Sequence, residues 1–289
     1  MCGTCGCSDL NNDVTLTDPK TGESRVLRSG GILQEQSPHD HEHAHSGGHD
    51  HGNHHHAHEG DNRPHVHGVN GEVISLEAAV LSKNDAIAAR NRGWFEGRGV
   101  LALNLVSSPG AGKTTLLEHT IHKFPGDGRI AVIEGDQMTA NDAERVRAAG
   151  AQAVQINTGA GCHLEADMIA EGVKALDLES GAILMIENVG NLVCPAMFDL
   201  GEQMKIAVIS VTEGEDKPLK YPHMFRASGC VVINKMDIAE AVEFDEAQCR
   251  ENILSVNPDA QILAVSSKTG QGMDAWFDFL NRQVEGLMG

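Results

Sequence analysis

The sequence predicts a doubly wound, mostly parallel α/β domain over residues 68–289, preceded by a Cys- and His-rich segment that we expect to be disordered. Short apolar runs without polar alternation recur through the domain, as in strands covered on both faces, and helical patterns separate them. A Gly-rich loop typical of phosphate binding follows the first run. Residues 39–67, by contrast, offer almost nothing apolar to bury.

The order of the expected elements follows from the alternation of strand and helix patterns. The first helix is expected from Ser75, its N-cap, to about Phe95. Strands are expected at 100–106, 129–134, 153–158, 182–187, 206–212, 230–234 and 261–266. Further helices are expected at 113–124, 140–149, 163–176, 239–256 and 273–287. Because ligands of such sheets bind at the carboxyl ends of the strands, we expect functional residues in the loops that follow them.

Composition narrows the classes of function. The 289 residues include 22 Lys and Arg against 41 Asp and Glu, and the resulting net charge of −19 disfavours non-specific nucleic-acid binding. Aromatic residues make up 3% of the chain, too few for base-stacking platforms. No apolar run approaches the roughly 18 residues of a membrane span, and residues 1–7 carry neither the basic nor the apolar segment expected of a secretory signal. We therefore expect a cytoplasmic protein whose 7 Cys are metal ligands or buried thiols rather than disulfides.

Residues 107–115 match a phosphate-binding loop in all but one position. The pattern Gly-x-x-x-x-Gly-Lys-Ser/Thr is complete at its end, but Ser107 replaces the first glycine. The strand before the loop and the helix after it supply the expected context, in which loop amides cradle phosphates. We expect Lys113 to reach the β- and γ-phosphates and Thr114 to hold Mg²⁺. The residues of the loop expected to contact nucleotide are Gly110, Ala111, Gly112, Lys113, Thr114 and Thr115.

A second motif, Asn234-Lys235-Met-Asp237, follows the sixth expected strand about 120 residues later. A carboxylate at Asp237 can accept two hydrogen bonds from guanine, which adenine does not offer. After the last strand, Ser266, Ser267 and Lys268 suit the loop whose amides contact guanine O6. Together the two motifs predict a P-loop GTPase domain.

Two acidic residues at strand ends are expected in catalysis together with Lys113. Asp136 follows the second strand and is placed to reach Mg²⁺ directly or through water. Glu187 opens Glu-Asn-Val-Gly190, which resembles an acidic-x-x-Gly switch that senses the γ-phosphate, with Glu in place of the usual Asp. Either acid could instead cap a strand end, and for Asp136 this alternative stays open.

The first seven residues form a metal-binding motif in which Cys2, Cys5 and Cys7 place three soft ligands close together. Thiolates with amine or amide nitrogens suit square-planar Ni²⁺, whereas four thiolates would suit tetrahedral Zn²⁺. A redox role would need a thioredoxin-like context. Residues 8–38 are interpreted as a polar linker.

The tract of residues 39–67 interleaves His with Asp, Glu and Gly, a composition that favours weak binding of several metal ions, as in storage. A purification tag is the alternative, but the irregular spacing and internal position argue against it. The candidate ligands are His39, His41, His43, His45, His49, His51, His54, His55, His56, His58, His65 and His67.

A third metal site is predicted inside the globular domain. Cys162 and His163 follow the third strand, and Cys194 follows the fourth, so all three belong to the edge expected to bind nucleotide. Each Cys alone would be interpreted as a small core residue. A symmetric dimer could complete the coordination of a metal held by these three residues.

Together these motifs resemble the hydrogenase nickel-incorporation GTPases, HypB, over about residues 68–289 and the terminal cysteines. That family is similar to the dimerising GTPases of the signal-recognition and septum-site class. The resemblance implies slow hydrolysis of GTP to GDP with Mg²⁺, a homodimer promoted by nucleotide or metal, and Ni²⁺ delivery to the [NiFe]-hydrogenase large subunit with a HypA-type partner. It also implies that Cys2, Cys5 and Cys7 form a tight Ni²⁺ site, and that Cys162, His163 and Cys194 bind Ni²⁺ or Zn²⁺.

Three alternative functions remain at this point. The chain could be a nickel storage protein with an idle GTPase domain. It could be a metallochaperone GTPase that serves urease, although the terminal cysteines and the Cys194-Pro195 loop favour hydrogenase. A nucleotide kinase of the P-loop class is disfavoured by the guanine-reading motif.

Overall fold

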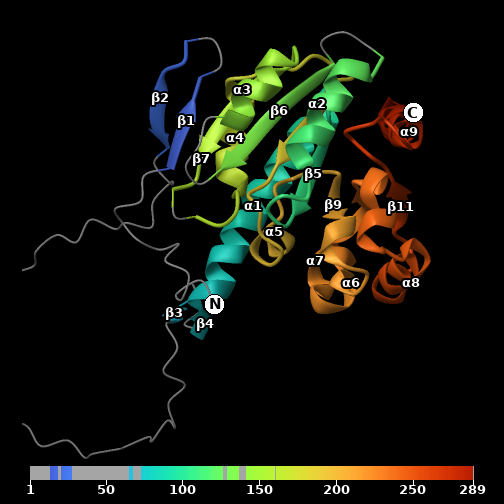
Figure 1. The fold of residues 1–289 in the computed structure, drawn as a ribbon. Helices are drawn as coiled ribbons and strands as arrows, with labels where there is room; N and C mark the ends of the chain where they lie inside the picture. The colour runs from blue at the N-terminus through green and yellow to red at the C-terminus, as the bar shows by residue number, and fades with distance from the viewer. Residues whose placement is uncertain are drawn as a thin grey trace, which may run out of the picture.

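The structure is a computed structural model that describes residues 14–18, 21–27, 65–67, 73–125, 129–136, 141–159 and 161–288. Within these ranges the main sheet has nine strands in the order β11-β10-β9-β5-β8-β6-β7-β1-β2 (Figure 1). All seven expected strands are present and mutually parallel, which confirms the predicted fold class. They are β5 (Leu101–Ser107), β6 (Ile130–Asp136), β7 (Gln152–Asn157), β8 (Ile183–Glu187), β9 (Met204–Ser210), β10 (Ser228–Asn234) and β11 (Gln261–Ala264).

The six expected helices are also present, with shifted ends. They are α1 (Leu76–Arg98), α2 (Lys113–Lys123), α3 (Asn141–Ala148), α4 (Ala166–Lys174), α8 (Glu246–Val256) and α9 (Met273–Met288). Three short helices were not predicted: α5 (Cys194–Met197), α6 (Lys217–Lys220) and α7 (Pro222–Ala227).

The prediction of a helix over residues 239–256 is wrong for its first residues, because the helix begins at Glu246. Short 3-10 turns at Met236–Ile238 and Glu240–Val242 occupy this region instead. Glu243 then takes a left-handed conformation with φ 55°, which interrupts a helix because it crowds the side chain against the backbone. α8 starts only after Asp245, whose carboxylate accepts a hydrogen bond from the Gln248 amide at 3.0 Å and caps the helix.

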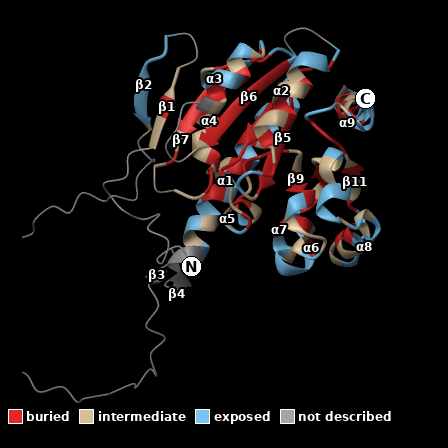
Figure 2. Ribbon diagram, in the orientation of Figure 1, coloured by how far each residue is buried: buried red, intermediate tan, exposed pale blue. Residues whose placement is uncertain are grey.

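Side chains that alternate along the parallel strands build a core on each face of the sheet. On one face Leu103, Val132 and Met185 pack in a cluster with side chains from α2 and α9. On the other face Ile133 and Ile156 pack in a cluster with side chains of α1 and α4. Figure 2 shows the central strands as buried, with exposed residues on the helices and on the edge strand β2. Burial on both faces explains why these strands read as continuous apolar runs.

Two further strands that the sequence did not predict, β1 (Val14–Thr17) and β2 (Ser24–Leu27), extend one edge of the main sheet. β1 pairs antiparallel with β7, and β2 pairs antiparallel with β1. Part of the segment interpreted as a linker therefore belongs to the sheet. A separate hairpin of β3 (His65–His67) and β4 (Val73–Ser75) precedes α1.

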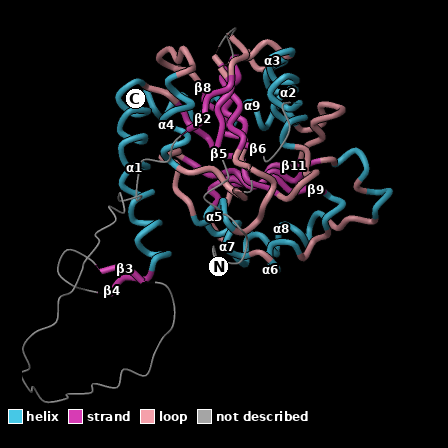
Figure 3. The backbone as a smooth tube through the Cα atoms, turned by 90° about the vertical axis from the view of Figure 1, so that its left-hand side faces the viewer, coloured by secondary structure: helices cyan, strands magenta, loops and turns pink. Residues whose placement is uncertain are grey.

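Helix α1 runs along the same face of the sheet as α4, as the turned view shows (Figure 3). It therefore covers the sheet beside the loop that joins β7 to α4. Among the helices in the described part of the chain, none is long and apolar enough to cross a membrane.

Candidate functional site

The phosphate-binding loop joins the end of β5, at Ser107, to the start of α2, at Lys113. Gly112 caps α2 with φ 97°, and a Cβ there would lie 2.5 Å from Asn234 Nδ2, so both conformation and space require glycine. Lys113 Nζ donates to Ser107 Oγ at 2.7 Å. The serine that replaces the first glycine of the pattern thus holds the lysine folded over the loop.

The motif Asn234–Asp237, which the sequence predicts to read guanine, is bonded directly to this loop. Asn234 Nδ2 donates to the Ala111 carbonyl at 3.1 Å, and Lys235 Nζ donates to the Gly110 carbonyl at 2.7 Å. Ser267 donates to Asn234 Oδ1 from both its amide, at 3.1 Å, and its hydroxyl, at 2.9 Å. Three segments far apart in the sequence are therefore held in one arrangement.

A cavity of about 250 Å³ opens between these segments. It is lined by Gly112, Thr115, Asn234, Lys235, Asp237, Ile238, Ser267 and Lys268. The Asp237 carboxylate accepts a hydrogen bond from Ser266 Oγ at 2.6 Å, which fixes its orientation. Most of the residues expected to contact nucleotide thus surround one space of the size that a base can enter.

Two buried carboxyl groups lie beside the phosphate loop on adjacent strands. Thr114 Oγ1 donates to Glu187 Oε1 at 2.8 Å, and Glu134 of β6 is paired in register with Glu187 of β8. The Oε2 atoms of Glu134 and Glu187 are buried without a hydrogen-bond partner. Burial, with Glu187 and Asp136 nearby, raises the pKa of Glu134 to about 9. Burial also raises the pKa of Glu187, opposed by the charge of Lys113.

This pair fits a divalent cation, since carboxylate oxygens and a threonine hydroxyl are ligands that Mg²⁺ prefers. A bound cation would supply the positive charge that balances two adjacent buried carboxylates. Asp136, expected near Mg²⁺, ends β6, and its carbonyl accepts from the Thr158 amide at 2.8 Å.

The predicted metal ligands of the domain converge as expected from the sequence. One ligand atom from each of Cys162, His163 and Cys194 lies within 4.8 Å of the others. The His163 ring is buried against Phe198, with ring centroids 3.9 Å apart. Its Nδ1 lies 3.6 Å from Cys162 Sγ, and its Nε2 lies 3.6 Å from Glu165 Oε1. Two thiols and an imidazole form a donor set for a borderline metal such as Ni²⁺ or Zn²⁺.

Asn188 connects this cluster to the phosphate side. It directly follows Glu187, and its buried Oδ1 accepts a hydrogen bond from the Leu164 amide at 3.1 Å. Leu164 directly follows His163. Asn188 Nδ2 donates to Asn104 Oδ1 of β5 at 3.2 Å. The residue that directly follows Glu187 therefore bonds through its side chain to the loop that carries the imidazole.

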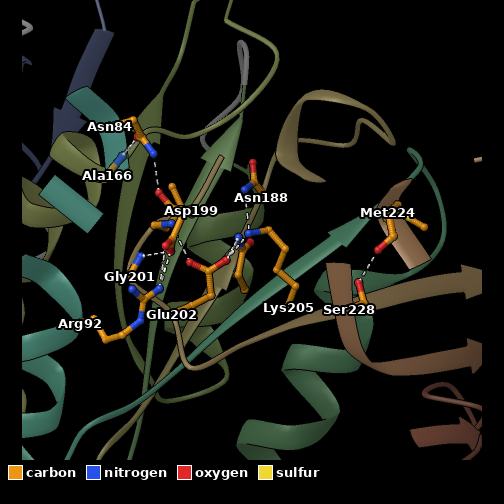
Figure 4. A network of polar contacts seen from close by, with 12 residues as sticks. Asn84, Arg92, Ala166, Asn188, Asp199, Gly201, Glu202, Lys205, Met224 and Ser228 are labelled. Atoms are coloured by element: carbon orange, nitrogen blue, oxygen red, sulfur yellow. Dashed lines mark hydrogen bonds and ion pairs between the residues drawn. The ribbon is translucent and has the colours of Figure 1, made fainter. Parts of the chain in front are cut away.

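The segments that carry the metal ligands are also fastened to α1. Asn84 accepts from the Ala166 amide at 2.9 Å and donates to the Asp199 carbonyl at 2.6 Å. Arg92 donates to both oxygens of the Asp199 carboxylate, at 2.7 and 2.8 Å. Figure 4 shows Arg92 and Gly201 converging on Asp199, with Glu202 and Lys205 beside them. α1 thus fixes the chain just after His163 and just after Cys194.

The structure does not describe the side chains of the remaining candidate ligands. Cys2, Cys5, Cys7 and the His tract from His39 to His58 lie outside the described residues. His65 and His67 lie on β3, where the backbone alone is described.

Three residues of the site were missed by sequence reasoning: Glu134, Asn188 and Ser107 as the partner of Lys113. Glu134 carried a signal, because it is an acid inside an apolar strand run. Asn188 and Ser107 are polar residues at strand ends, where such residues serve many purposes. Their hydrogen-bond partners, the Leu164 amide and Lys113, could be identified only from the fold.

Comparisons with known proteins identify the family of the chain. Residues 101–264 match the model of the CobW/HypB/UreG nucleotide-binding domain. The chain is 44% identical to the hydrogenase maturation factor HypB of Escherichia coli K12, over 98% of this chain and 99% of that protein. It is 56% identical to HypB of Rhizobium leguminosarum, over 75% of this chain and 73% of that protein.

A solved structure supports the same relation. The crystal structure of HypB from Helicobacter pylori in complex with nickel is 41% identical, with a TM-score of 0.66. The match covers 71% of this chain and 96% of that one. On the strength of the matched domain and the nearly full-length identity, the chain belongs to the HypB family of hydrogenase maturation GTPases.

Proposed function

We propose that the chain hydrolyses GTP in order to bind Ni²⁺ and deliver it during maturation of the [NiFe]-hydrogenase large subunit. Its family membership supports the pathway, and the nickel in the Helicobacter pylori complex supports the metal. The observation that carries the proposal is the Asn188 side chain, which joins the phosphate side of the edge to the loop of His163.

The nucleotide half has residues for each part of the substrate. Asp237 reads guanine, the loop amides from Gly110 to Thr115 hold the phosphates, and Lys113 neutralises the charge that develops during transfer. Thr114 and Glu187 would hold Mg²⁺, with Asp136 reaching it directly or through water. Mg²⁺ supplies charge stabilisation at the γ-phosphate.

The metal half treats Ni²⁺ as cargo. Cys162, His163 and Cys194 provide three ligands, and a second copy of the chain could supply the rest of the coordination. Cys2, Cys5 and Cys7 form a separate tight site, and the His tract holds a reserve of weakly bound ions. A HypA-type chaperone and the hydrogenase large subunit are the proposed partners.

The two halves communicate through Glu187 and Asn188. Thr114 and Glu187 would hold Mg²⁺ of the GTP complex, and this would shift the adjacent Asn188 together with the Leu164 amide that donates to it. The Cys162–His163 loop then differs between the GTP and GDP states, and so does its affinity for metal.

Metal transfer into the large subunit tests this function. The full chain, loaded with Ni²⁺, is mixed with metal-free large subunit and a HypA-type chaperone, with GTP, GDP or ATP. We expect nickel to enter the large subunit faster with GTP than with GDP or ATP, measured as protein-bound nickel and hydrogenase activity. Equal transfer with all three nucleotides would contradict the proposal and favour a storage protein. The same assay with a urease apoenzyme tests the alternative that the chain serves urease. The Helicobacter pylori relative is named a hydrogenase/urease maturation factor.

A further inference from the structure

A buried ion pair lies on the chain between the short helix α5 and strand β9. Glu202 Oε1 accepts a hydrogen bond from Lys205 Nζ at 2.6 Å, and the two side chains are only 3% and 11% exposed. Such a pair contributes little to stability, because taking two charges out of water costs about as much as their attraction returns. The other contacts of Glu202 indicate a different role.

The Glu202 carboxylate accepts from two more donors. Asn104 Nδ2 of β5 donates to Oε1 at 3.0 Å, and the Leu200 amide donates to Oε2 at 2.7 Å. Figure 4 shows Glu202 and Lys205 in one polar network with Asn188. A carboxylate has two acceptor oxygens and no donor, so it satisfies all three donors at once.

The carboxylate also sets the direction of two neutral amides. Because Glu202 only accepts, Asn104 must turn its NH2 group to Glu202 and its oxygen away. Asn188 then turns its own NH2 group to the Asn104 oxygen, at 3.2 Å. Its Oδ1 is left to accept from the Leu164 and Val189 amides, at 3.1 and 3.0 Å. Both asparagines are buried, so a wrongly turned amide would leave unpaired polar groups away from water.

The chain of contacts from Glu202 through Asn104 to Asn188, here called the amide relay, reaches both segments that carry metal ligands. At one end it holds the amide of Leu164, which directly follows His163. At the other end the carboxylate holds the amide of Leu200, six residues after Cys194. Hydrogen bonds therefore connect the two segments through a single carboxylate.

We propose that Glu202 is a positioning residue for the metal site of the domain, which acts by fixing the orientation of Asn104 and Asn188. The segments that carry His163 and Cys194 are thereby held in a set arrangement. The effect on nickel rests on the proposed function, but the orientation of the relay is measurable without metal or nucleotide.

Hydrogen exchange of the Leu164 amide, followed by NMR in the full chain, tests this orientation. Glu202→Gln leaves one oxygen for three donors, so the relay loses its fixed direction. We expect Leu164 to exchange about tenfold faster, as for the loss of one hydrogen bond, relative to the buried Val232 amide of β10, which reports opening of the sheet. Glu246→Gln, which removes an exposed ion pair with Arg250 on α8, is the control and should change neither rate.

A charge swap gives the decisive result. In the double variant E202Q/N104D the carboxylate moves one position along the relay, where it can accept both from the new amide at position 202 and from Asn188. Lys205 keeps a carboxylate partner, because it pairs in register with Asn104 on the adjacent strand. We expect Leu164 exchange to return to within about twofold of the wild-type rate, whereas two independent defects would add.

Asn104→Leu tests the same relay if E202Q does not fold. It leaves the contacts of Glu202 with Lys205 and Leu200 in place and removes only the link to Asn188. Leu164 exchange should be faster by a similar factor. An unchanged Leu164 rate in E202Q, or in N104L where E202Q does not fold, would overturn the proposal.

A coupling measurement separates this proposal from the proposed function. The factor by which Ni²⁺ changes the affinity for a GTP analogue should fall from at least about fivefold in wild type to about twofold or less in E202Q, and recover in E202Q/N104D. Faster Leu164 exchange in E202Q, with no coupling in wild type, would support the relay and contradict the proposed function. Wild-type coupling that persists in E202Q, with unchanged Leu164 exchange, would contradict the relay alone.

Discussion

At the carboxyl edge of the sheet, the proposed guanine side, around the cavity of Asn234 and Ser267, differs from the phosphate side in how its polar groups are satisfied. Asn234, Lys235 and Ser267 bond to one another and to the phosphate loop. On the phosphate side, Glu134 and Glu187 each keep a buried carboxyl oxygen without a hydrogen-bond partner. The edge therefore combines a preformed nucleotide cavity with groups that only a cation or a proton can satisfy.

This difference indicates how the two sides divide the work. A preformed guanine cavity binds with little reorganisation, so it fixes which nucleotide enters. Buried groups without partners are costly, so their arrangement depends on which cation or phosphate is present. We infer that substitutions on the guanine side change which nucleotide binds. Substitutions around Glu187 and Asn188 instead change the coupling between nucleotide binding and metal binding.

The largest effect is expected from Asp237→Asn. The amide can donate to the O2 of xanthine but no longer accepts from guanine, so the preference for GTP over xanthosine triphosphate should fall by about 10⁴-fold. Competition binding with both nucleotides measures the change. Glu240→Gln, an exposed acid nearby, is the control, and an unchanged preference in D237N would contradict the role assigned to Asp237.

Lys113→Ala should reduce the rate of GTP hydrolysis by about 10²–10³-fold, because a positioned cation at the transferred phosphate is lost. Phosphate release under saturating GTP is the measurement. Lys123→Ala at the exposed end of α2 should retain the wild-type rate. A K113A rate near wild type would show that another cation neutralises the phosphate.

Cys162→Ala should weaken Ni²⁺ binding at the domain site by about 100-fold. Loss of a residue that only hydrogen-bonds to a metal ligand already costs about 10–100-fold in affinity. Metal competition with a chelator, in a chain with C2S, C5S and C7S, measures it. Cys249→Ala is the matched control, because that thiol is buried and its pKa is raised to about 12. Equal losses in both variants would mean that the effect comes from instability.

Asn188→Ala should break the coupling while leaving each site able to bind. In wild type we expect Ni²⁺ to change the affinity for a GTP analogue by about 5–150-fold, and in N188A by much less. Asn188→Asp keeps the acceptor for the Leu164 amide and should retain part of the coupling. Asn252→Ala on α8 is the remote control. Wild-type coupling in N188A would show that the signal takes another route.

A separate prediction concerns the pH dependence of stability and Glu134. Its pKa of about 9 in the folded protein exceeds the usual value, so the unfolded chain binds fewer protons between about pH 4.5 and 9. Stability of the nucleotide-free protein should therefore be full below this window and fall as pH rises, by up to about 1.4 kcal/mol per pH unit.

Glu134→Gln should remove this contribution and be more stable than wild type at neutral pH. Urea unfolding at several pH values checks it, with the exposed Glu96→Gln as control. A parallel pH dependence in E134Q and wild type would place the charged form of Glu134 in the folded protein.

Sequence reasoning succeeded where a local pattern determines the structure. Apolar runs located all seven parallel strands, and the fixed spacing of the two nucleotide motifs placed both at one cavity. It failed for β1 and β2, whose burial is limited to residues such as Leu16 and depends on pairing with a distant strand. The Asn188–Leu164 hydrogen bond was equally hidden, because it joins residues 24 positions apart through the fold.

The most direct test of the account is Ni²⁺ affinity in two nucleotide states. The full chain carrying C2S, C5S and C7S is titrated with Ni²⁺ in GDP and then in a non-hydrolysable GTP analogue, with and without Cys162→Ala. We predict affinities that differ by at least about fivefold between the nucleotides and a difference that disappears in the C162A chain. Equal affinities in GDP and the GTP analogue would contradict a nucleotide-controlled metal site.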